Sequence, residues 1–290
     1  MSDAHSFSNS PKVMPLRPPA GTIESWCFDL ITTTNLATKL EPPPIPALSD
    51  EATWECDPVA RPETRPGRPP ELRVIARSGS TPRPAALVQA NARGKLLHLF
   101  AHHELQAAEL FAWALLAFPE APREFRSGLA RLCVEELAHM KLYRDHMRGI
   151  GTEYGSHPVR DWFWERMPAC TEPAAFVSLQ GLGLEGANLD HTVRFAGYFR
   201  AAGDEGGARI LEQIERDETA HVAFAKEWFE HFTGAPLTFD AWRAKLPAPL
   251  TPSVLQSRPL NRSARMAAGL DAAFLDALAA APPTNLRRAE

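Results

Sequence analysis

The residues of this chain whose types and spacing could do chemistry are two Glu-x-x-His pairs and two lone glutamates. They are Glu136 with His139, Glu218 with His221, Glu104 and Glu185. Each lone glutamate precedes its pair by nearly the same interval, 32 residues in the first half and 33 in the second. A glutamate and a histidine three residues apart share one face of a helix, so both can reach one metal ion. Two such pairs with two single glutamates are typical of a four-helix site for two iron or two manganese ions.

One Glu-x-x-His pair alone would be weak evidence for a metal site, because such a pair arises by chance and is often a surface contact. The joint pattern is stronger. An acid stands immediately before each paired glutamate, Glu135 and Asp217, and a second acid follows each lone glutamate by five residues, Glu109 and Asp190. The two halves thus repeat at an offset of 81 to 82 residues. A duplicated helical hairpin would leave this pattern.

The repeat predicts how the ligands divide between two metals. One metal is expected on Glu104, Glu136 and His139, and the other on Glu185, Glu218 and His221. The paired glutamates are the natural bridges. Four carboxylates and two imidazoles favour two iron ions over copper or structural zinc, with manganese or a mixed manganese–iron pair as the alternative.

The acids preceding the paired glutamates are predicted to orient the histidines. A metal-bound histidine usually donates its other N–H to a carboxylate. In antiparallel helices each acid can reach the opposite helix, which pairs Asp217 with His139 and Glu135 with His221. The alternative is that both acids are solvent-facing charges at the edge of the bundle.

Other polar residues near these positions have ordinary interpretations. Glu109 and Asp190 lie about 140° round their helices from the lone glutamates, so they are expected in an outer layer or at the surface. The histidines His98, His102 and His103 fall on different helical faces, which favours packing or surface roles over a third metal site.

Three glycines surround Glu185 in the third predicted helix: Gly181, Gly183 and Gly186. Glycine in a helix interior costs up to about 1 kcal/mol relative to alanine, so three together need a reason. Close helix packing is one reason. An opening or π-bulge beside the metals, giving oxygen or substrate a path, is the other.

Composition limits the class of protein. The chain has 290 residues, a net charge of −4 and 44% hydrophobic residues. The charge argues against a nucleic-acid partner. No apolar run is long enough for a membrane span and the N-terminus is polar, which predicts a cytoplasmic protein without a membrane partner. The four cysteines form no C-x-x-C pair, which excludes a zinc ribbon or a rubredoxin-type iron site.

Proline content divides the chain into three expected parts. Residues 1–85 are predicted to form a proline-rich arm, with one helix at about 22–40, docked on the core. Residues 86–234 are expected to form a four-helix bundle, and residues 235–290 a tail with one helix, at about 263–281.

The predicted fold class is all-α. Apolar residues recur at intervals of three and four, with the lone glutamates on the apolar faces. The expected helices cover 85–118, 122–149, 171–202 and 204–232. The long connection at 150–170 suits a crossover between the second and third helices better than a tight hairpin.

Four sequence segments resemble a bacterial ferritin-like family filed as domain of unknown function 455. They are GTIESW at 21–26, PGRPPELR at 66–73, HHELQAAE at 102–109 and DWFWE at 161–165. The start ELQA at 104–107 also resembles the Glu-Ser-Gln-Ala of rubrerythrins. The resemblance covers about residues 20–235 and implies a ferritin-like di-metal carboxylate fold without an established substrate.

Three functions compete at this point. The first is an oxygen-dependent di-iron oxidase or hydroxylase, which would use dioxygen, a small-molecule substrate and an external electron donor. The second is a ferroxidase or a rubrerythrin-like peroxidase acting on peroxide. The third is a non-enzymatic helical interaction protein stabilised by metal. A homodimer is compatible with all three.

Overall fold

The computed structural model describes residues 16–77 and 81–282. The fold class predicted from the sequence is confirmed, because the described residues are helical and form no β-strand. An isolated parallel bridge joins Val74 to Val159. Within the described ranges, no helix is both long and apolar enough to cross a membrane.

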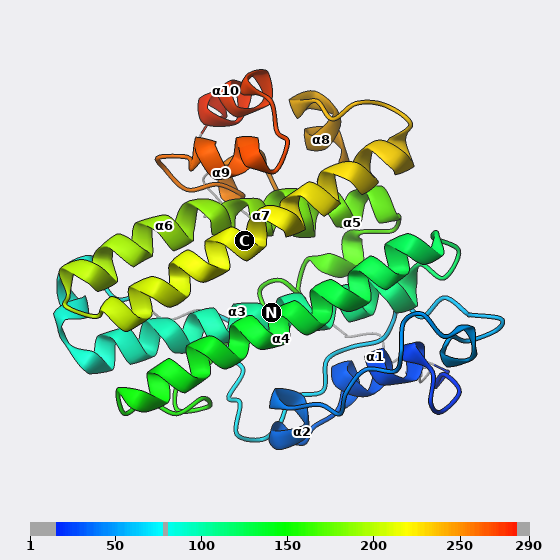
Figure 1. The fold of residues 1–290 in the computed structure, drawn as a ribbon, viewed down its shortest axis with the longest axis horizontal. Helices are drawn as coiled ribbons and strands as arrows, with labels where there is room; N and C mark the ends of the chain where they lie inside the picture. Colours follow the sequence, from blue (N-terminus) through cyan, green and yellow to red (C-terminus); the bar gives the residue numbers. More distant parts are fainter. Residues whose placement is uncertain (1–15, 78–80, 283–290) are drawn as a thin grey trace, which may run out of the picture.

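Four long helical segments lie side by side and form the centre of the molecule (Figure 1). They are α3 (Ala90–Ala117), α4 (Arg123–Gly149), the continuous run of α5 (Pro173–Leu179), π-helix η4 (Gln180–Glu185) and α6 (Gly186–Ala201), and α7 (Glu205–Thr233). Helix α3 packs on α4, α6 packs on α7, and α4 contacts α7 across the two pairs. The predicted helix at 171–202 is therefore interrupted by one π-helical stretch.

The direction of each helix follows from contacts at one end of this arrangement. Arg93 near the start of α3 donates to Asp204 Oδ2 at 2.8 Å, and His146 near the end of α4 lies 2.9 Å from Asp204 Oδ1. Asp204 itself caps the start of α7, accepting from the Gly207 N–H at 2.9 Å. Since α6 ends at Ala201, just before this cap, α3 runs antiparallel to both α4 and α6.

The described part of the arm contains two α-helices, so the prediction of one helix over about 22–40 is wrong. Helix α1 spans Ile23–Thr32 and α2 spans Leu36–Leu40. Thr33 takes extended backbone with ψ 137°, and Asn35 caps α2. The chain then folds back, because the Lys39 ammonium donates to the Leu30 and Ile31 carbonyls at the end of α1, each at 3.0 Å.

Up to residue 282, where the described part ends, the tail contains three short α-helices, so the prediction of one helix at about 263–281 is also wrong. They are α8 (Phe239–Lys245), α9 (Arg262–Ala267) and α10 (Ala272–Ala280). Gly269, at φ +89°, ends the turn after α9, and Asp271 caps α10 by accepting from the Phe274 N–H. Positive φ is a conformation that glycine adopts at little cost, which stops the helix there.

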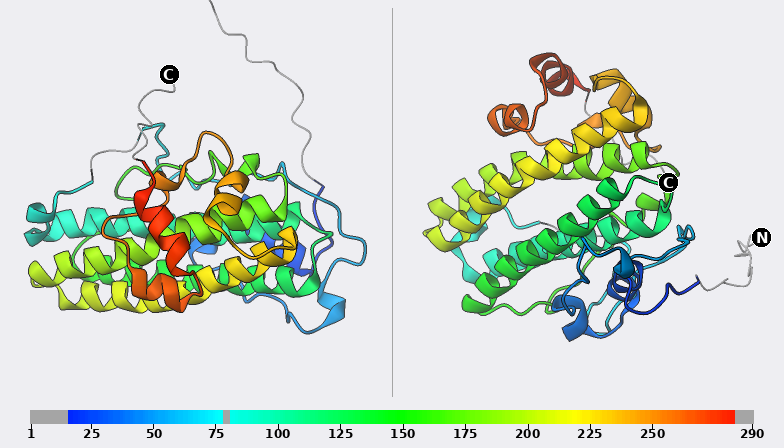
Figure 2. Two further views of the ribbon diagram at one scale, coloured as in Figure 1. Left: turned by 90° about the horizontal axis from the view of Figure 1, so that it is seen from above. Right: turned by 45° about the vertical axis from the view of Figure 1, so that its right-hand side comes forward.

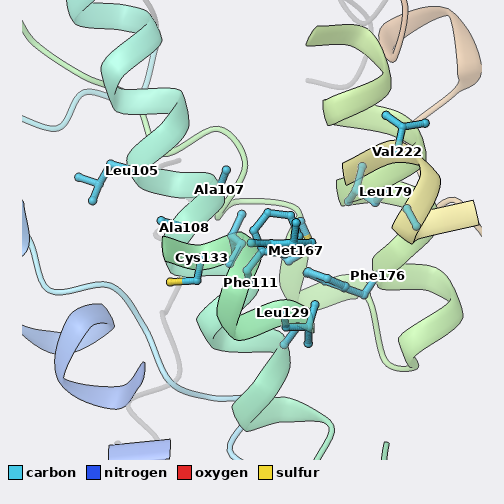
Figure 3. Packing of buried hydrophobic residues seen from close by; sticks show 14 of the residues in the cluster. Leu105, Ala107, Ala108, Phe111, Leu129, Cys133, Met167, Phe176, Leu179 and Val222 are labelled. Carbon is cyan, nitrogen blue, oxygen red and sulfur yellow. The ribbon is translucent and has the colours of Figure 1, made fainter. Parts of the chain in front are cut away.

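The arm and the tail cover opposite sides of the four long helices, as Figure 1 and the right-hand view of Figure 2 show. Short 3-10 turns connect the elements. These are η1 (Glu51–Thr53), η2 (Pro84–Val88), η3 (Met167–Ala169) and η5 (Pro252–Val254). One buried apolar cluster runs from Ile23 in the arm to Leu278 in the tail. Phe111, Phe176 and Val222 lie within it, where helices from both halves meet (Figure 3).

Candidate metal centre

The four long helical segments bring the six predicted ligands into the interior, each at most 4% exposed. They are Glu104 on α3, Glu136 and His139 on α4, Glu185 at the end of the π-helix, and Glu218 and His221 on α7. One ligand atom each from Glu104, Glu136, His139 and Glu218 all lie within 4.8 Å of one another. One cation could contact all four at that separation.

The two paired glutamates lie between the two histidines. His221 Nδ1 is 2.9 Å from Glu136 Oε1 and 2.9 Å from Glu218 Oε2. His139 Nδ1 is 3.4 Å from Glu136 Oε2 and 3.8 Å from Glu218 Oε1. Each carboxylate therefore turns one oxygen toward each histidine.

Several of these inward atoms are buried without a hydrogen-bond partner. They are both carboxylate oxygens of Glu136, Oε2 of Glu218, and Nδ1 of His139 and of His221. The 2.9 Å contacts of His221 are short enough for ion pairs but lack hydrogen-bond alignment. Buried polar atoms are rarely left unpaired. Five such atoms converging on one point fit a set of metal ligands.

The outer nitrogen of each histidine faces an acid on the neighbouring helix. His139 Nε2 is 3.2 Å from Asp217 Oδ2, and His221 Nε2 is 2.8 Å from Glu135 Oε2. Both acids are partly exposed, with side chains 43% and 52% accessible. A carboxylate accepting the Nε2 proton leaves the Nδ1 lone pair directed inward, where a metal could take it.

Two amides contact the carboxylates in ways that sequence reasoning missed. Gln180 Nε2 donates to Glu185 Oε1, and Asn188 Nδ2 donates to Glu218 Oε1 at 3.0 Å. Asn188 lies three residues after Glu185 and so shares its helical face, a signal that spacing offered. Gln180 reaches Glu185 across the π-helix, and no regular helical spacing would have singled it out.

The electrostatics of the site are dominated by carboxylates. Within the described part of the chain, no lysine or arginine forms an ion pair with the four central carboxylates. Burial and the charge of Glu136 raise the pKa of Glu104 well above its usual range. Burial alone would lower the pKa of His139, but contact with Glu136 raises it to about 9. Anionic groups crowded in this way favour a bound cation.

A cavity of about 690 Å³ reaches Glu104 and Glu185 from the side of α3 and α6. Its wall also includes the crossover residues Trp162 and Phe163, and helix residues such as Tyr143. A cavity of this size is typical of a site for a small organic molecule. The predicted ligands therefore have a space beside them that could hold a substrate.

The three clustered histidines of α3 contact neighbouring side chains or line the cavity. His102 Nδ1 lies 2.8 Å from the Tyr154 hydroxyl, and its Nε2 lies 3.1 Å from Asp161. His98 and His103 line the cavity. In the described residues these histidines join no group able to hold a metal.

The glycines beside Glu185 allow close packing, and the π-helix is present as well. A Cβ on Gly181 would lie 2.2 Å from Ala225 Cβ, and one on Gly186 would lie 3.1 Å from an Arg265 nitrogen. None of the three glycines lines the described cavity, whereas Leu184 and Asn188 do. The glycines face neighbouring elements, and the other side of the π-helix faces the cavity.

Glu109 is buried and fully paired, so a surface position for it is excluded. It accepts from Lys39 Nζ at 2.7 Å and from two Arg68 nitrogens at 2.7 and 2.8 Å. Trp164 Nε1 adds a bond at 2.8 Å. Burial would raise the pKa of Glu109, but Arg68 and Lys39 hold it below its usual value.

Asp190, at the equivalent position of the second half, is buried and paired in the same way. Both of its oxygens accept from Arg265, at 3.0 and 2.9 Å. The backbone N–H groups of Ser257 and Asn261 also donate to it, at 2.9 and 2.7 Å. Glu109 therefore anchors the arm, and Asp190 anchors the tail.

Comparison with known sequences places the chain in a family. It belongs to the family described as protein of unknown function (DUF455), whose profile matches residues 32–276. It is 30% identical to an uncharacterized protein of Haemophilus influenzae over 141 residues, which are 46% of this chain and 49% of that relative. The chain thus spans about half the length of the curated relative it matches. No solved structure matches the chain significantly. None of these descriptions states an activity.

Proposed function

We propose that this protein is a ferritin-like di-iron carboxylate oxidase or hydroxylase that uses dioxygen on a small organic substrate. The observation that carries the proposal is the set of unpartnered Glu136, Glu218, His139 and His221 atoms in the interior. Glu104, which groups with Glu136, His139 and Glu218, also lines the cavity. Carboxylate and imidazole ligands suit iron or manganese. Bound iron would supply the redox chemistry.

The chain's own residues would hold and tune the centre. Glu104, Glu136 and His139 would hold one ion, and Glu185, Glu218 and His221 the other. Asp217 and Glu135 would accept hydrogen bonds from the Nε2–H groups of His139 and His221. The Nδ1 lone pairs of both histidines would then be free to bind a metal ion. The amides of Gln180 and Asn188 would fix the orientation of Glu185 and Glu218.

The cavity favours an oxidase or hydroxylase over iron storage. Only Glu104 and Glu185 of the predicted ligands line it, so a substrate would meet the centre from the side of those two residues. The aromatic side chains Trp162, Phe163 and Tyr143 on its wall would exclude water. A route for iron ions alone would need no such apolar wall.

The test is anaerobic loading with ferrous iron, followed by metal analysis and exposure to oxygen. We expect about two iron ions per chain, oxygen uptake by the reduced protein, and a visible absorption change. Deposition of iron far beyond that amount would favour a ferroxidase instead. Iron-loaded protein that takes up no oxygen would contradict the proposal and leave the metal with a structural role.

A further inference from the structure

The cavity beside the predicted centre has two unlike ends. Buried Glu104 and Glu185 close its inner end, whereas exposed Lys95 and half-buried Arg194 also belong to its lining. Lys95 lies nine residues before Glu104 on α3, and Arg194 lies nine residues after Glu185 on α6. Because α3 and α6 are antiparallel, both cations lie on the same side of the carboxylates. Nine residues of helix rise about 14 Å.

The cationic end has an unbalanced charge. Within the described lining, Glu104 and Glu185 are the carboxylates, and both lie at the inner end. Lys95 makes no ion pair with a described residue, and Arg194 donates to the neutral Ser257 hydroxyl at 2.6 Å. Arg160 lines the cavity too, but Glu165 neutralises it at 2.7 Å. An anion entering at this end would therefore meet two uncompensated cations.

The wall between the two ends carries aromatic side chains. Phe100 packs against Phe195 at 5.0 Å between ring centroids, and His103 packs against Phe163 at 5.0 Å. Aromatic walls favour a hydrocarbon or ring system over a polar chain.

From this polarity we propose that the cavity binds an amphipathic organic acid, with its anionic head at Lys95 and Arg194 and its apolar body directed toward Glu104 and Glu185. This rests on the proposed function only for the chemistry at the inner end. The binding itself depends on the wall and on the two cations. The head is a carboxylate or a phosphate monoester, since both would pair with these cations.

The experiment is calorimetric titration of the full chain with four probes that share one alkyl body. The probes are decanoate, decyl phosphate, decanol and decyltrimethylammonium. We expect at least one of the two anions to bind about tenfold or more tightly than decanol, and the cation to bind most weakly. The comparison of decanoate with decyl phosphate identifies the head group. Equal binding of decanol, or tighter binding of the cation, would overturn the assignment.

The variant Lys95→Gln tests the head-group contact without disturbing the fold, because the side chain is exposed. Its anion affinity should fall about fivefold, the size of one exposed charge contact, while decanol binding stays unchanged. Lys141→Gln is the matched control, since Lys141 on α4 is exposed and outside the cavity lining. Equal anion affinities for the two variants would show that the anionic head of the ligand does not contact Lys95.

The same protein separates this inference from the proposed function. Anion binding without oxygen uptake by the iron-loaded chain would contradict the oxidase and retain the cavity assignment. Oxygen uptake with no preference for anions would retain the oxidase and reject the assignment.

Discussion

Two kinds of buried carboxylate lie five residues apart on the same helices. Glu109 and Asp190 face lysine or arginine side chains from the arm and the tail. Glu104 and Glu185 face other carboxylates and form no ion pair with a lysine or arginine among the described residues. All four are almost completely buried, so burial alone does not distinguish them.

The difference is the source of the opposing charge. At Glu109 and Asp190 the protein supplies its own cations, so these sites are complete in the folded chain. At Glu104 and Glu185 burial and neighbouring carboxylates raise the pKa, and no described lysine or arginine forms an ion pair with either carboxylate. A site of the second kind is suited to take its cations from solution.

The largest effect is expected where a buried pair is broken. Arg265→Ala removes the bidentate partner of Asp190, and both side chains are 0% exposed. An uncompensated buried charge should lower the free energy of unfolding by about 3–5 kcal/mol. Chemical denaturation measures this. Arg262→Ala on the same helix breaks an exposed pair with Asp276 and should change stability by less than about 1 kcal/mol. Similar losses of unfolding free energy in both variants would show that Arg265 is not needed to stabilise the buried charge of Asp190.

Substitution of a central carboxylate should lower the amount of metal that the protein binds. Glu136→Ala removes a predicted ligand that faces both histidines. A change at a residue that only contacts a ligand typically lowers metal affinity about 10–100-fold, and we expect a larger loss here. Elemental analysis after dialysis measures bound metal. Glu124→Ala, an exposed position on the same helix, should retain all of it. Full metal retention in Glu136→Ala would make the centre an ordinary buried acidic cluster.

A smaller effect is expected at the acid that contacts His139 Nε2. Asp217→Asn keeps the shape of the side chain and loses its charge, so metal affinity should fall about 10–100-fold. Titration against a competing chelator measures this affinity. An unchanged dissociation constant would mean that the 3.2 Å contact does not orient His139.

The smallest expected effect is on the pH dependence of stability, at Asp161, a carboxylate that is paired with a cationic side chain of the protein. Asp161 contacts Arg68 at 2.9 Å and His102 at 3.1 Å. Burial would raise the pKa of Asp161, but these partners lower it to about 2. Because the unfolded value is about 4, the stabilisation is complete above that pH and is lost as pH falls toward the folded value.

Wild-type protein should therefore be more stable than Asp161→Asn by about 1–2 kcal/mol near pH 6, after allowance for partial exposure. The difference should shrink below about pH 4. Urea unfolding at several pH values measures it. A difference independent of pH down to about 2 would show that the charge of Asp161 does not stabilise the fold.

Short-range periodicity explains which features could be predicted. Positions three and four residues apart share a helical face wherever the helix is placed, so the sequence predicted the all-helical class and drew attention to the six buried acids and histidines. The acids beside them followed from the direction of antiparallel helices. The ligand assignment itself stays a prediction that the metal content of the variants tests.

Long-range pairing explains what could not be predicted. Lys39 and Glu109 are 70 residues apart, and Asp190 and Arg265 are 75 apart, with no periodic relation between them. Sequence reasoning therefore left Glu109 and Asp190 between an outer layer and the surface. The break between α1 and α2 depends on Lys39 folding back onto α1 carbonyls, a contact that helix propensity does not reveal.

The anchoring of Asp190 by Arg265 also sets an order of events during biosynthesis. Synthesis runs from the N-terminus, so α6 leaves the ribosome well before Arg265 does. Until then Asp190 has no partner, and burying it is unfavourable. We expect α6 to pack, and Glu185 to reach its final place, only after the tail is translated. Nascent chains stalled before residue 257 should therefore fail to bind a metal ion at these residues, whereas metal bound at that stage would contradict this order.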